Sequence, residues 1–307
     1  MAKDYEVIII GGGPAGLSAG IYASRSRLSC LLIEKVGLGG LVVNAEKVEN
    51  YPGFPEGISG MELTELMQRQ AQKFGLEAIT SEVQELQLNG ETKTVKTTAG
   101  NFSAKAVIIA TGSEHNKLGV PGEEKFTGKG VSFCATCDGY FFQNKTVAVV
   151  GGGNAALVEA LSLTKFASKV FVIHRRNELR ATKIIQERAL ANQKIEFHFN
   201  KMVSAIEGNN FVERLKLEDT ENHKTSVLKT DGIFVSIGFK PNTEFLKNAL
   251  SLDGAGYIVT DEVMATSVPG IFAAGDVRSN SIRQVVGATG DGAVAAIYAE
   301  RYLSEPH

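Results

Sequence analysis

One short pattern occurs twice in this chain of 307 residues, and it constrains the fold more than any other feature. Each copy has an apolar, β-branched run, a glycine-rich turn, an apolar helical stretch and a second apolar run. The first turn, at residues 11–16, reads GGGPAG, and the second, at residues 151–156, reads GGGNAA. Buried strand, glycine turn and helix in this order are typical of a doubly wound sheet that binds a dinucleotide. We therefore predict an α/β fold with two doubly wound, Rossmann-like dinucleotide-binding domains.

The first turn has every part that a nucleotide site needs. Gly11 and Gly13 let the backbone turn tightly and approach a pyrophosphate, and Gly16 lets the helix pack closely on the strand. The helix N-terminus adds free N–H groups and the positive end of the helix dipole. Glu34 ends the next strand 23 positions after Gly11, and an acid that binds ribose hydroxyls is expected about 20 positions on. A glycine turn alone is a weak signal, but this context predicts nucleotide binding.

The second turn repeats this spacing with the opposite charge. His174 lies 23 positions after Gly151, where the first copy has its acid, and Arg175, Arg176 and Arg180 extend a basic cluster. Guanidinium groups bind a phosphate on the ribose 2′ position, which an acid would repel. The alternative is that these basic residues are only a solvent-exposed run of charges at the end of a strand. The position of the cluster favours NADPH.

A CxxC motif, Cys134 and Cys137, precedes the second turn. Such a pair can cycle between a disulfide and a dithiol. Structural zinc would need four ligands, but Cys30 lies in an apolar strand and His174 lies among arginines that repel a cation. We therefore predict a redox-active disulfide and no metal. Asp138, directly after the pair, is a candidate general acid, and a turn-forming or helix-capping Asp is the alternative.

The C-terminal part of the chain has a further feature that is typical of a cofactor-binding site. A strand over residues 270–277 is predicted to end in an exposed Gly275-Asp276, where a carboxylate can meet a polyol. Because both ends of the chain have such features, the middle is predicted to be one domain inserted in another. We place the outer domain at residues 1–113 and 243–307, the inserted domain at residues 114–242, and a linker at residues 238–242.

Composition narrows the setting in which the protein works. The formal net charge of −2 does not indicate a nucleic-acid or membrane-surface partner. No apolar run approaches the roughly 20 residues of a membrane span, and residues 1–5 lead directly into a strand without a visible signal peptide. Three cysteines, two of them in one CxxC, do not make a secreted disulfide framework. We therefore expect a cytoplasmic protein.

Taken together, these motifs resemble those of the low-molecular-weight thioredoxin reductases, which are FAD- and NADPH-dependent flavoproteins. The resemblance runs from Tyr5 to Leu303 and is specific, because the CxxC falls inside the inserted nucleotide domain as in that family. It rests on residues 11–16, 34, 49–54, 110–112, 134–138, 151–156, 174–180, 275–277 and 283–285. It implies a homodimer whose outer segments hold FAD, and thioredoxin or a thioredoxin-like protein as the partner.

The resemblance also implies cofactor contacts. Those for FAD are Gly11, Gly13, Pro14, Ala15, Gly16, Glu34, Gly40, Asn50, Thr111, Gly112, Gly275, Asp276, Arg283, Gln284 and Val285. Those for NADPH are Gly151, Gly153, Asn154, Ala155, Ala156, His174, Arg175, Arg176 and Arg180. Asp276 would bind the ribityl chain, and Gln284 and Val285 would approach the flavin ring. Three positions depart from the family pattern, namely Leu41 for a usual Gln, Ala155 for Ser or Thr, and Val158 for the first of two Glu residues.

We therefore expect a thioredoxin-disulfide reductase, in which electrons pass from NADPH through FAD to the Cys134–Cys137 disulfide and then to thioredoxin. A reductase of another protein disulfide is one alternative. A dithiol oxidase that returns electrons to oxygen is a second, against which the basic cluster argues. A flavin-binding sensor would not need the CxxC. The sequence leaves open which cysteine attacks the partner.

Overall fold

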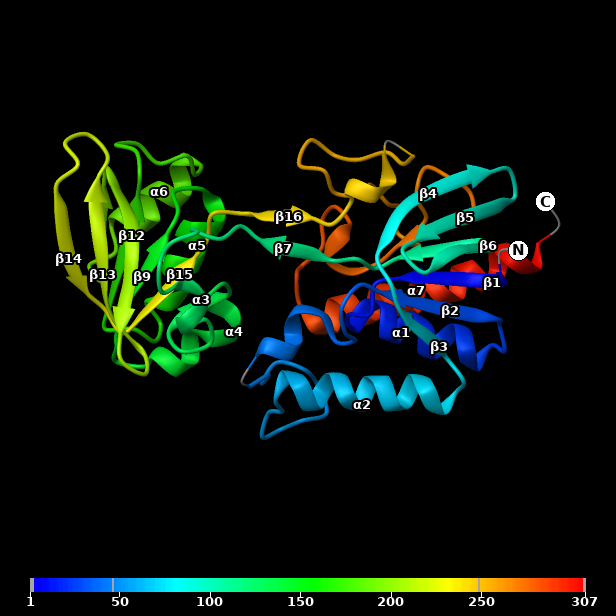
Figure 1. Cartoon of the computed structure of the whole chain (residues 1–307). Coiled ribbons are helices and arrows are strands. Elements are labelled where there is room, and N and C mark those ends of the chain that lie inside the picture. Colours follow the sequence, from blue (N-terminus) through cyan, green and yellow to red (C-terminus); the bar gives the residue numbers. More distant parts are fainter. Residues whose placement is uncertain (1–2, 46, 248, 306–307) are drawn as a thin grey trace. The chain divides into compact units, whose positions relative to one another are not determined.

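The structure, a computed structural model, describes residues 3–45, 47–247 and 249–305. The chain forms two compact units (Figure 1), of which unit 1 comprises Met1–Glu114 and Lys240–His307, and unit 2 comprises His115–Phe239. Unit 2, coloured green to yellow, is therefore inserted in unit 1. The chain passes from unit 1 to unit 2 one residue later than the domain boundary expected from the sequence. It returns to unit 1 three residues earlier than expected.

Unit 1 is built on a seven-stranded sheet with the order β3-β2-β1-β6-β5-β4, in which β17 also pairs with β6. The strands are β1 (Lys3–Ile10), β2 (Cys30–Glu34), β3 (Glu77–Thr80), β4 (Val83–Asn89), β5 (Thr92–Thr97), β6 (Gly100–Ile109) and β17 (Ile271–Ala273). β5 pairs antiparallel with the first half of β6, and β17 pairs parallel with its second half. Both faces of this part of the sheet are covered, and the parallel strands β1, β2 and β6 accordingly contain continuous buried apolar runs at residues 7–10, 30–33 and 106–109.

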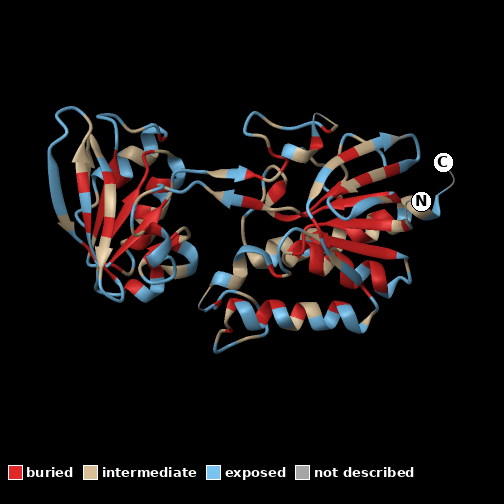
Figure 2. Cartoon of the chain, viewed as in Figure 1, coloured by how far each residue is buried: buried red, intermediate tan, exposed pale blue. Residues whose placement is uncertain are grey.

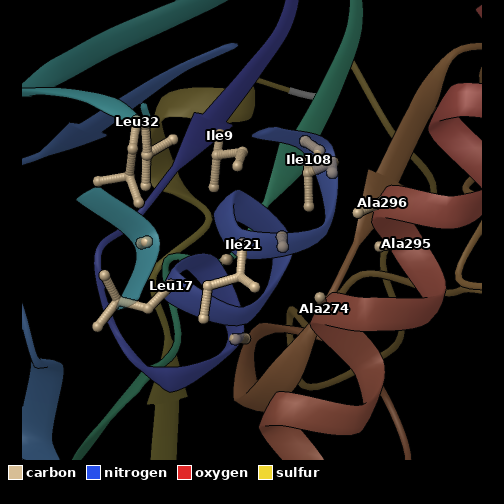
Figure 3. Close-up of a cluster of buried hydrophobic side chains, with 14 of the residues drawn as sticks. Ile9, Leu17, Ile21, Leu32, Ile108, Ala274, Ala295 and Ala296 are labelled. Carbon is tan, nitrogen blue, oxygen red and sulfur yellow. The ribbon is translucent and has the colours of Figure 1, made fainter. Parts of the chain in front are cut away.

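The helices of unit 1 are α1 (Pro14–Arg25), α2 (Gly60–Lys73) and α7 (Val285–Ser304). In Figure 3, Ile9 and Ile108 extend from neighbouring strands toward α1, beside Ala295 and Ala296 of α7. α2 buries residues spaced three or four positions apart, as an amphipathic helix does. The opposite face of the sheet packs against residues that follow unit 2 in the chain, namely Leu246, Leu250, Ile258 and Val277.

Unit 2 has a five-stranded parallel sheet with the order β11-β10-β9-β15-β8. Its strands are β8 (Val131–Ser132), β9 (Thr146–Val150), β10 (Lys169–His174), β11 (Ile195–Phe199) and β15 (Gly232–Val235), and its helices are α3 (Glu123–Phe126), α4 (Ala135–Asp138), α5 (Asn154–Leu163) and α6 (Lys183–Leu190). Alternate residues of β9 pack on two different layers. Val147 and Val149 meet α5, whereas Ala148 and Val150 join a core that includes the antiparallel sheet of β12 (Lys201–Gly208), β13 (Val212–Asp219) and β14 (Thr225–Lys229). Figure 2 shows the buried residues concentrated on these central strands.

The predicted linker at residues 238–242 contains the second boundary between the units, and its residues Phe239–Pro241 form a strand, β16, which pairs with β7 (Ser113–His115). Just beyond this pair, the backbone N–H of Asn116 donates to the carbonyl of Gly238 at 3.0 Å. The ring of His115 lies 4.6 Å from that of Phe133 and 4.4 Å from that of Phe239, measured between centroids. Two segments that are far apart in the sequence thus satisfy each other's backbone groups at the crossings.

The predicted fold class is confirmed, since both units are α/β with parallel sheets that follow the doubly wound pattern. The strand expected over residues 270–277 is shorter than predicted. β17 covers Ile271–Ala273, and Gly275–Val277 forms a 3-10 turn, η4. None of the helices in the described part of the chain has both the length and the apolar character needed to cross a membrane.

Two glycines of α7 allow a test of the close packing between α7 and α1. A β-carbon at Gly292 would lie 2.1 Å from the carbonyl oxygen of Ala15, whereas one at Gly290 would meet nothing within 4 Å. We expect Gly292→Ala to lower the free energy of unfolding by about 1–3 kcal/mol, because backbone must shift to admit the methyl group. Gly290→Ala should raise it by about 0.5–1 kcal/mol, because alanine loses less conformational entropy than glycine in a helix.

Urea unfolding of both variants measures the two effects within one helix. Equal changes in the two variants would show that the contact between Gly292 and Ala15 does not limit the packing of α7.

Candidate functional site

The first glycine turn is a backbone cradle at the end of β1. Gly11 has φ +106°, which glycine adopts without strain, and its N–H donates to the carbonyl of Ile33 at 2.8 Å. A β-carbon at Gly16 would lie 1.9 Å from the oxygen of Gly11, so the start of α1 packs directly on the turn. Gly13 faces open space, with only the α-carbon of Gly40 within 4 Å of its position for a β-carbon.

The first turn of α1 leaves its backbone N–H groups available. Gly13 is the N-cap residue and provides no side-chain cap, and Pro14 occupies the first turn, where a missing N–H costs nothing. Free N–H groups and the helix dipole attract anions at this position. The geometry therefore fits the pyrophosphate of a dinucleotide.

Glu34, at the end of β2, is anchored to this turn. Its Oε2 accepts a hydrogen bond from the Gly12 N–H at 2.6 Å, and its Oε1 accepts one from the Val36 N–H at 3.1 Å. An ionised carboxylate has about four acceptor positions, so two remain for ribose hydroxyls.

The Gly275-Asp276 turn lies against the same part of α1, since a β-carbon at Gly275 would be 2.9 Å from that of Ala15. The expectation of an exposed Gly-Asp is wrong, because Gly275 is buried and Asp276 is half-buried. Burial raises the pKa of the Asp276 carboxyl, and the hydrogen bond that Ser281 Oγ donates to it at 2.9 Å lowers the pKa in part. The two motifs of the outer domain thus converge at the start of α1.

Asn50, Gln284 and Val285 come together at the N-terminus of α7. Asn50 Nδ2 donates to Gln284 Oε1 at 2.9 Å, and Val285 begins the helix without a side-chain cap. The Arg283 guanidinium lies 5.2 Å from the centroid of the Tyr257 ring. Leu41, the departure from the family pattern, is 51% exposed.

Thr111 and Gly112 lie where β6 ends, opposite Asn242. Thr111 Oγ1 donates to the Asn242 carbonyl at 2.8 Å, and the Asn242 N–H donates to the Gly112 carbonyl at 3.1 Å. All the residues assigned to FAD by resemblance therefore lie in unit 1, and those assigned to NADPH lie in unit 2 with the CxxC.

The second glycine turn joins β9 to α5. A β-carbon at Gly151 would lie 2.3 Å from the carbonyl oxygen of Ser236 and 2.7 Å from the β-carbon of Ala156, so this turn is also packed from behind. Gly153 faces open space and caps α5 without a side-chain hydrogen bond. Ala155 is exposed in the first turn of the helix.

The loop after β10 is tied to this turn. The N–H groups of Arg180 and Ala181 both donate to the Gly152 carbonyl, at 2.7 and 3.1 Å. Asn154 Oδ1 accepts a hydrogen bond from the Thr182 N–H at 2.7 Å. The loop therefore presents its side chains next to the N-terminus of α5.

His174 supports this loop from inside. It is 5% exposed, its Nε2 lies 3.1 Å from the Glu178 carbonyl, and a β-carbon at Gly152 would lie 2.5 Å from its ring. Burial lowers the pKa of His174, and the charges of the neighbouring arginines lower it further, so the ring is neutral at pH 7. The cationic groups of the cluster are the exposed Arg175, Arg176 and Arg180.

The Cys134–Cys137 disulfide is formed and lies at the start of α4. Cys134 is the N-cap residue, and its Sγ accepts a hydrogen bond from the Cys137 N–H at 3.1 Å. Cys137 is exposed and Cys134 is half-buried, so the disulfide is open to a reaction partner. Cys30 is buried in β2, and burial raises the pKa of its thiol to about 12, so this third cysteine is chemically inert.

Hydrogen bonds of Ser132 connect the Asp138 carboxyl group with the backbone of the cysteine pair. Ser132 Oγ donates to Asp138 Oδ2 at 2.6 Å and accepts a hydrogen bond from the Cys134 N–H at 3.1 Å. The Asp138 side chain makes no capping hydrogen bond to the following 3-10 turn, η2 (Gly139–Phe142). Within the described ranges, no group of three or more His, Cys, Asp or Glu residues could hold a metal ion.

Comparison with known proteins shows what this arrangement is similar to. Residues 5–292 match the model of a family described as pyridine nucleotide-disulphide oxidoreductase. The thioredoxin reductase of Bacillus subtilis (strain 168) is 49% identical over 304 residues, which cover 99% of this chain and 96% of the relative. The thioredoxin reductase of Streptococcus pyogenes MGAS5005 is 44% identical, with a TM-score of 0.94 and 99% of each chain covered. That of Giardia duodenalis is 36% identical, with a TM-score of 0.93, and covers 99% of this chain and 100% of its own.

The chain belongs to the pyridine nucleotide-disulphide oxidoreductase family. The resemblance to thioredoxin reductases that the motifs indicated is confirmed over the full length of the chain. As a member of this family the protein is an oxidoreductase.

Sequence reasoning missed an ion pair that holds the family's Gly-Asp turn in place. Arg278 donates to Asp291 of α7 through Nε at 2.6 Å and through Nη2 at 2.9 Å. Asp291 Oδ2 also accepts a hydrogen bond from the Gly275 N–H at 3.1 Å. The available signal was a single acidic residue in a helix that is otherwise small and apolar as far as Tyr298.

The ion pair between Arg278 and Asp291 should stabilise the observed conformation of the Gly275-Asp276 turn. Its side chains are only 17% and 13% exposed, so we expect Asp291→Ala to lower the free energy of unfolding by roughly 3 kcal/mol, because Arg278 is left without its partner. The variant should also retain less flavin on gel filtration, because the Gly275 amide loses its acceptor.

Glu244→Ala is the matched control, because it breaks an exposed ion pair with Lys240 in the same unit. It should change neither melting temperature nor flavin content noticeably. An Asp291→Ala protein that melts and binds flavin like the control would contradict the role of the pair.

Proposed function

We propose that this protein is an NADPH-dependent thioredoxin-disulfide reductase that uses FAD. The observation that carries the proposal is an accessible Cys134–Cys137 disulfide in the same unit as a nucleotide turn flanked by three exposed arginines. The full-length relatives named thioredoxin reductase support it. We further propose that unit 1 is the FAD domain, that unit 2 is the NADPH domain, and that the protein is a cytoplasmic homodimer.

The residues of unit 1 fit FAD. The open side of Gly13 and the uncapped start of α1 suit the pyrophosphate, Glu34 suits a ribose, and Asp276 suits the ribityl chain. Bound there, FAD would supply a centre that accepts two electrons from a nicotinamide and delivers them to a disulfide. The protein's part is to bind, orient and shield this group.

The residues of unit 2 fit NADPH rather than NADH. Gly153 and the start of α5 suit the pyrophosphate, and Arg175, Arg176 and Arg180 can form charge-assisted hydrogen bonds to a 2′-phosphate. The neutral His174 keeps the loop in place without adding charge.

The reduced pair then reacts with the partner protein by thiol–disulfide exchange. One thiolate attacks the partner's disulfide and forms a mixed disulfide, and the second thiol attacks this bond, which releases the partner as a dithiol and restores Cys134–Cys137. We assign to Asp138, which directly follows Cys137 and whose carboxyl group accepts a hydrogen bond from Ser132 Oγ, the donation of a proton to a departing thiolate. Tyr140 and Phe141, 55% and 40% exposed just after the pair, offer aromatic surface to a protein partner.

A reductase of a different protein disulfide has the same machinery, and substrate assays distinguish it. The basic cluster favours a reductase over a dithiol oxidase, because a 2′-phosphate contact serves the use of NADPH as the electron donor.

The arginine cluster predicts nucleotide preference. Arg175→Ala combined with Arg176→Ala should raise KM for NADPH at least tenfold and leave KM for NADH nearly unchanged, because only NADPH has a phosphate for these side chains to bind. Steady-state kinetics with both nucleotides measure this. Lys183→Ala, an exposed basic residue at the start of α6, is the control. Equal effects on the two nucleotides would show that the cluster is only a solvated face.

The cysteine pair predicts where the electrons leave. The purified protein should contain about one FAD per chain. Cys134→Ser or Cys137→Ser should abolish thioredoxin reduction, because exchange needs both thiols, while NADPH should still bleach the flavin absorbance. Cys30→Ser is the control and should keep full turnover, because Cys30 lies buried in β2. If either Cys134→Ser or Cys137→Ser still reduced thioredoxin, the assigned path of the electrons would be wrong.

A further inference from the structure

A short loop joins two of the motifs that we assign to the flavin. It covers residues 278–284, between the Gly275-Asp276 turn, η4, and the start of α7. Two of its residues have a left-handed backbone without being glycine, namely Asn280 with φ +61° and Arg283 with φ +52°. A residue with the side chain of arginine rarely adopts this conformation, so contacts in the folded chain must hold it there.

One hydroxyl group connects the two ends of this loop. Ser281 Oγ donates a hydrogen bond to Asp276 Oδ1 at 2.9 Å and accepts one from the Arg283 N–H at 3.2 Å. A serine hydroxyl has one donor and two acceptor positions, so it can make both bonds at once. Ser281 and Asp276 are both half-buried, so the bond between them is partly shielded from water.

The first turns of α7 lie close to both sides of this loop. A β-carbon at Gly275 would lie 3.5 Å from that of Ala288, and one at Gly287 would lie 2.7 Å from Cγ1 of Ile282. Ile282 therefore lies against α7, while its neighbour Ser281 bonds to Asp276. Because Ser281 also holds the Arg283 amide, its position relates the Asp276 carboxyl group to the start of α7.

We propose that Ser281 is a positioning residue for the flavin site, whose hydroxyl group holds the Asp276 carboxylate in place for the ribityl hydroxyls of FAD. This role deepens the proposed function and rests on it for the identity of the cofactor. Ser281 acts through Asp276 and is assigned no contact with the cofactor.

The hydrogen bond from Ser281 leaves Asp276 able to bind a sugar alcohol. An ionised carboxylate accepts about four hydrogen bonds, so one bond at Oδ1 leaves other positions for hydroxyl donors. A hydroxyl group binds an ionised carboxylate more strongly than a neutral acid. A donor at Oδ1 also stabilises the ionised form, so Ser281 affects both the position and the charge of Asp276.

The surrounding charges give this role a pH dependence. Burial raises the pKa of the Asp276 carboxyl, and Asp291 of α7, the helix against which η4 packs, raises it further. The hydrogen bond from Ser281 lowers this pKa, as do the charges of Arg283 and Arg278 on the same loop. Without the Ser281 hydroxyl, the pKa should therefore be higher, and Asp276 should become neutral at a higher pH.

The test measures how tightly the full-length enzyme holds FAD, from the rise in flavin fluorescence as the cofactor is released. Ser281→Ala should raise the dissociation constant for FAD roughly three- to tenfold, because Asp276 loses a hydrogen-bond donor. Ser281→Thr keeps the hydroxyl group and should recover most of the affinity.

Ser279→Ala is the matched control in the same loop. Ser279 bonds through its backbone, since its N–H donates to the Ile258 carbonyl at 2.8 Å and its carbonyl accepts from Arg278 Nη1 at 3.3 Å. Removal of its hydroxyl group should leave the dissociation constant for FAD at the value of the parent enzyme.

The pH profile of FAD release distinguishes positioning of Asp276 from a general loosening of the loop. In the parent enzyme FAD binding should weaken as the pH falls and Asp276 is protonated. In Ser281→Ala the midpoint should move to higher pH, and in Ser279→Ala it should not move. A loosened loop would weaken binding equally at every pH. An unchanged affinity or an unmoved midpoint in Ser281→Ala overturns the proposal.

A second variant keeps the test decisive if Ser281→Ala does not fold. Ser281→Cys has a similar size and a weaker donor, so its midpoint should also move to higher pH, by a smaller amount. A midpoint that stays at the parent value in Ser281→Cys contradicts the role of the hydroxyl group.

Hydrogen exchange in the full-length protein without FAD separates this role from the proposed cofactor. The backbone of residues 281–286 should exchange faster in Ser281→Ala than in the parent or in Ser279→Ala, because the Arg283 N–H loses its acceptor. If the parent binds no FAD, the proposed cofactor is wrong, and the exchange rates still decide whether Ser281 holds this loop. Equal exchange in all three proteins overturns the proposal.

Discussion

The start of α1 is held by contacts that leave no room for additional side-chain atoms. A β-carbon at Gly16 would lie 1.9 Å from the Gly11 oxygen, one at Gly292 would lie 2.1 Å from the Ala15 oxygen, and one at Gly275 would lie 2.9 Å from the Ala15 β-carbon. The turn after β1, helix α7 and the Gly-Asp turn therefore meet at one point of the backbone. The open side of Gly13 belongs to the same turn, so the packing that stabilises unit 1 also shapes the candidate site for a cofactor.

The two nucleotide turns share this backbone design and differ in their electrostatics. In unit 1 an anchored carboxylate, Glu34, ends the second strand, and an acid at that position suits free ribose hydroxyls. In unit 2 the equivalent position is His174, which is buried and neutral and acts as packing under Gly152. The positive charge is moved outward to the exposed arginines that follow. The change of residue type at this repeated position, together with the arginines that follow it, thus gives the two turns different charge.

The redox segment differs from the two glycine turns, because its short helix depends on contacts with residues outside the helix. α4 is one turn long and is not stable by itself, and the amide of its N-cap residue, Cys134, donates a hydrogen bond to Ser132 Oγ, which lies outside the helix. Within this segment Cys137 is exposed and Cys134 is half-buried. The dependence on outside contacts makes the segment sensitive to groups that lie outside the CxxC motif.

The sequence by itself determined both glycine turns, the acid and the basic cluster at equal spacing, the CxxC and the insertion of one domain in another. These features depend on backbone requirements and periodicities that are local, so they can be read without knowing the packing. Only the tertiary structure decided that residues 239–241 form a strand with β7, that Asp276 is half-buried, and that Arg278 pairs with Asp291. Each of these contacts joins elements whose relative placement is set by the burial of apolar faces elsewhere, and no spacing within one segment encodes that placement.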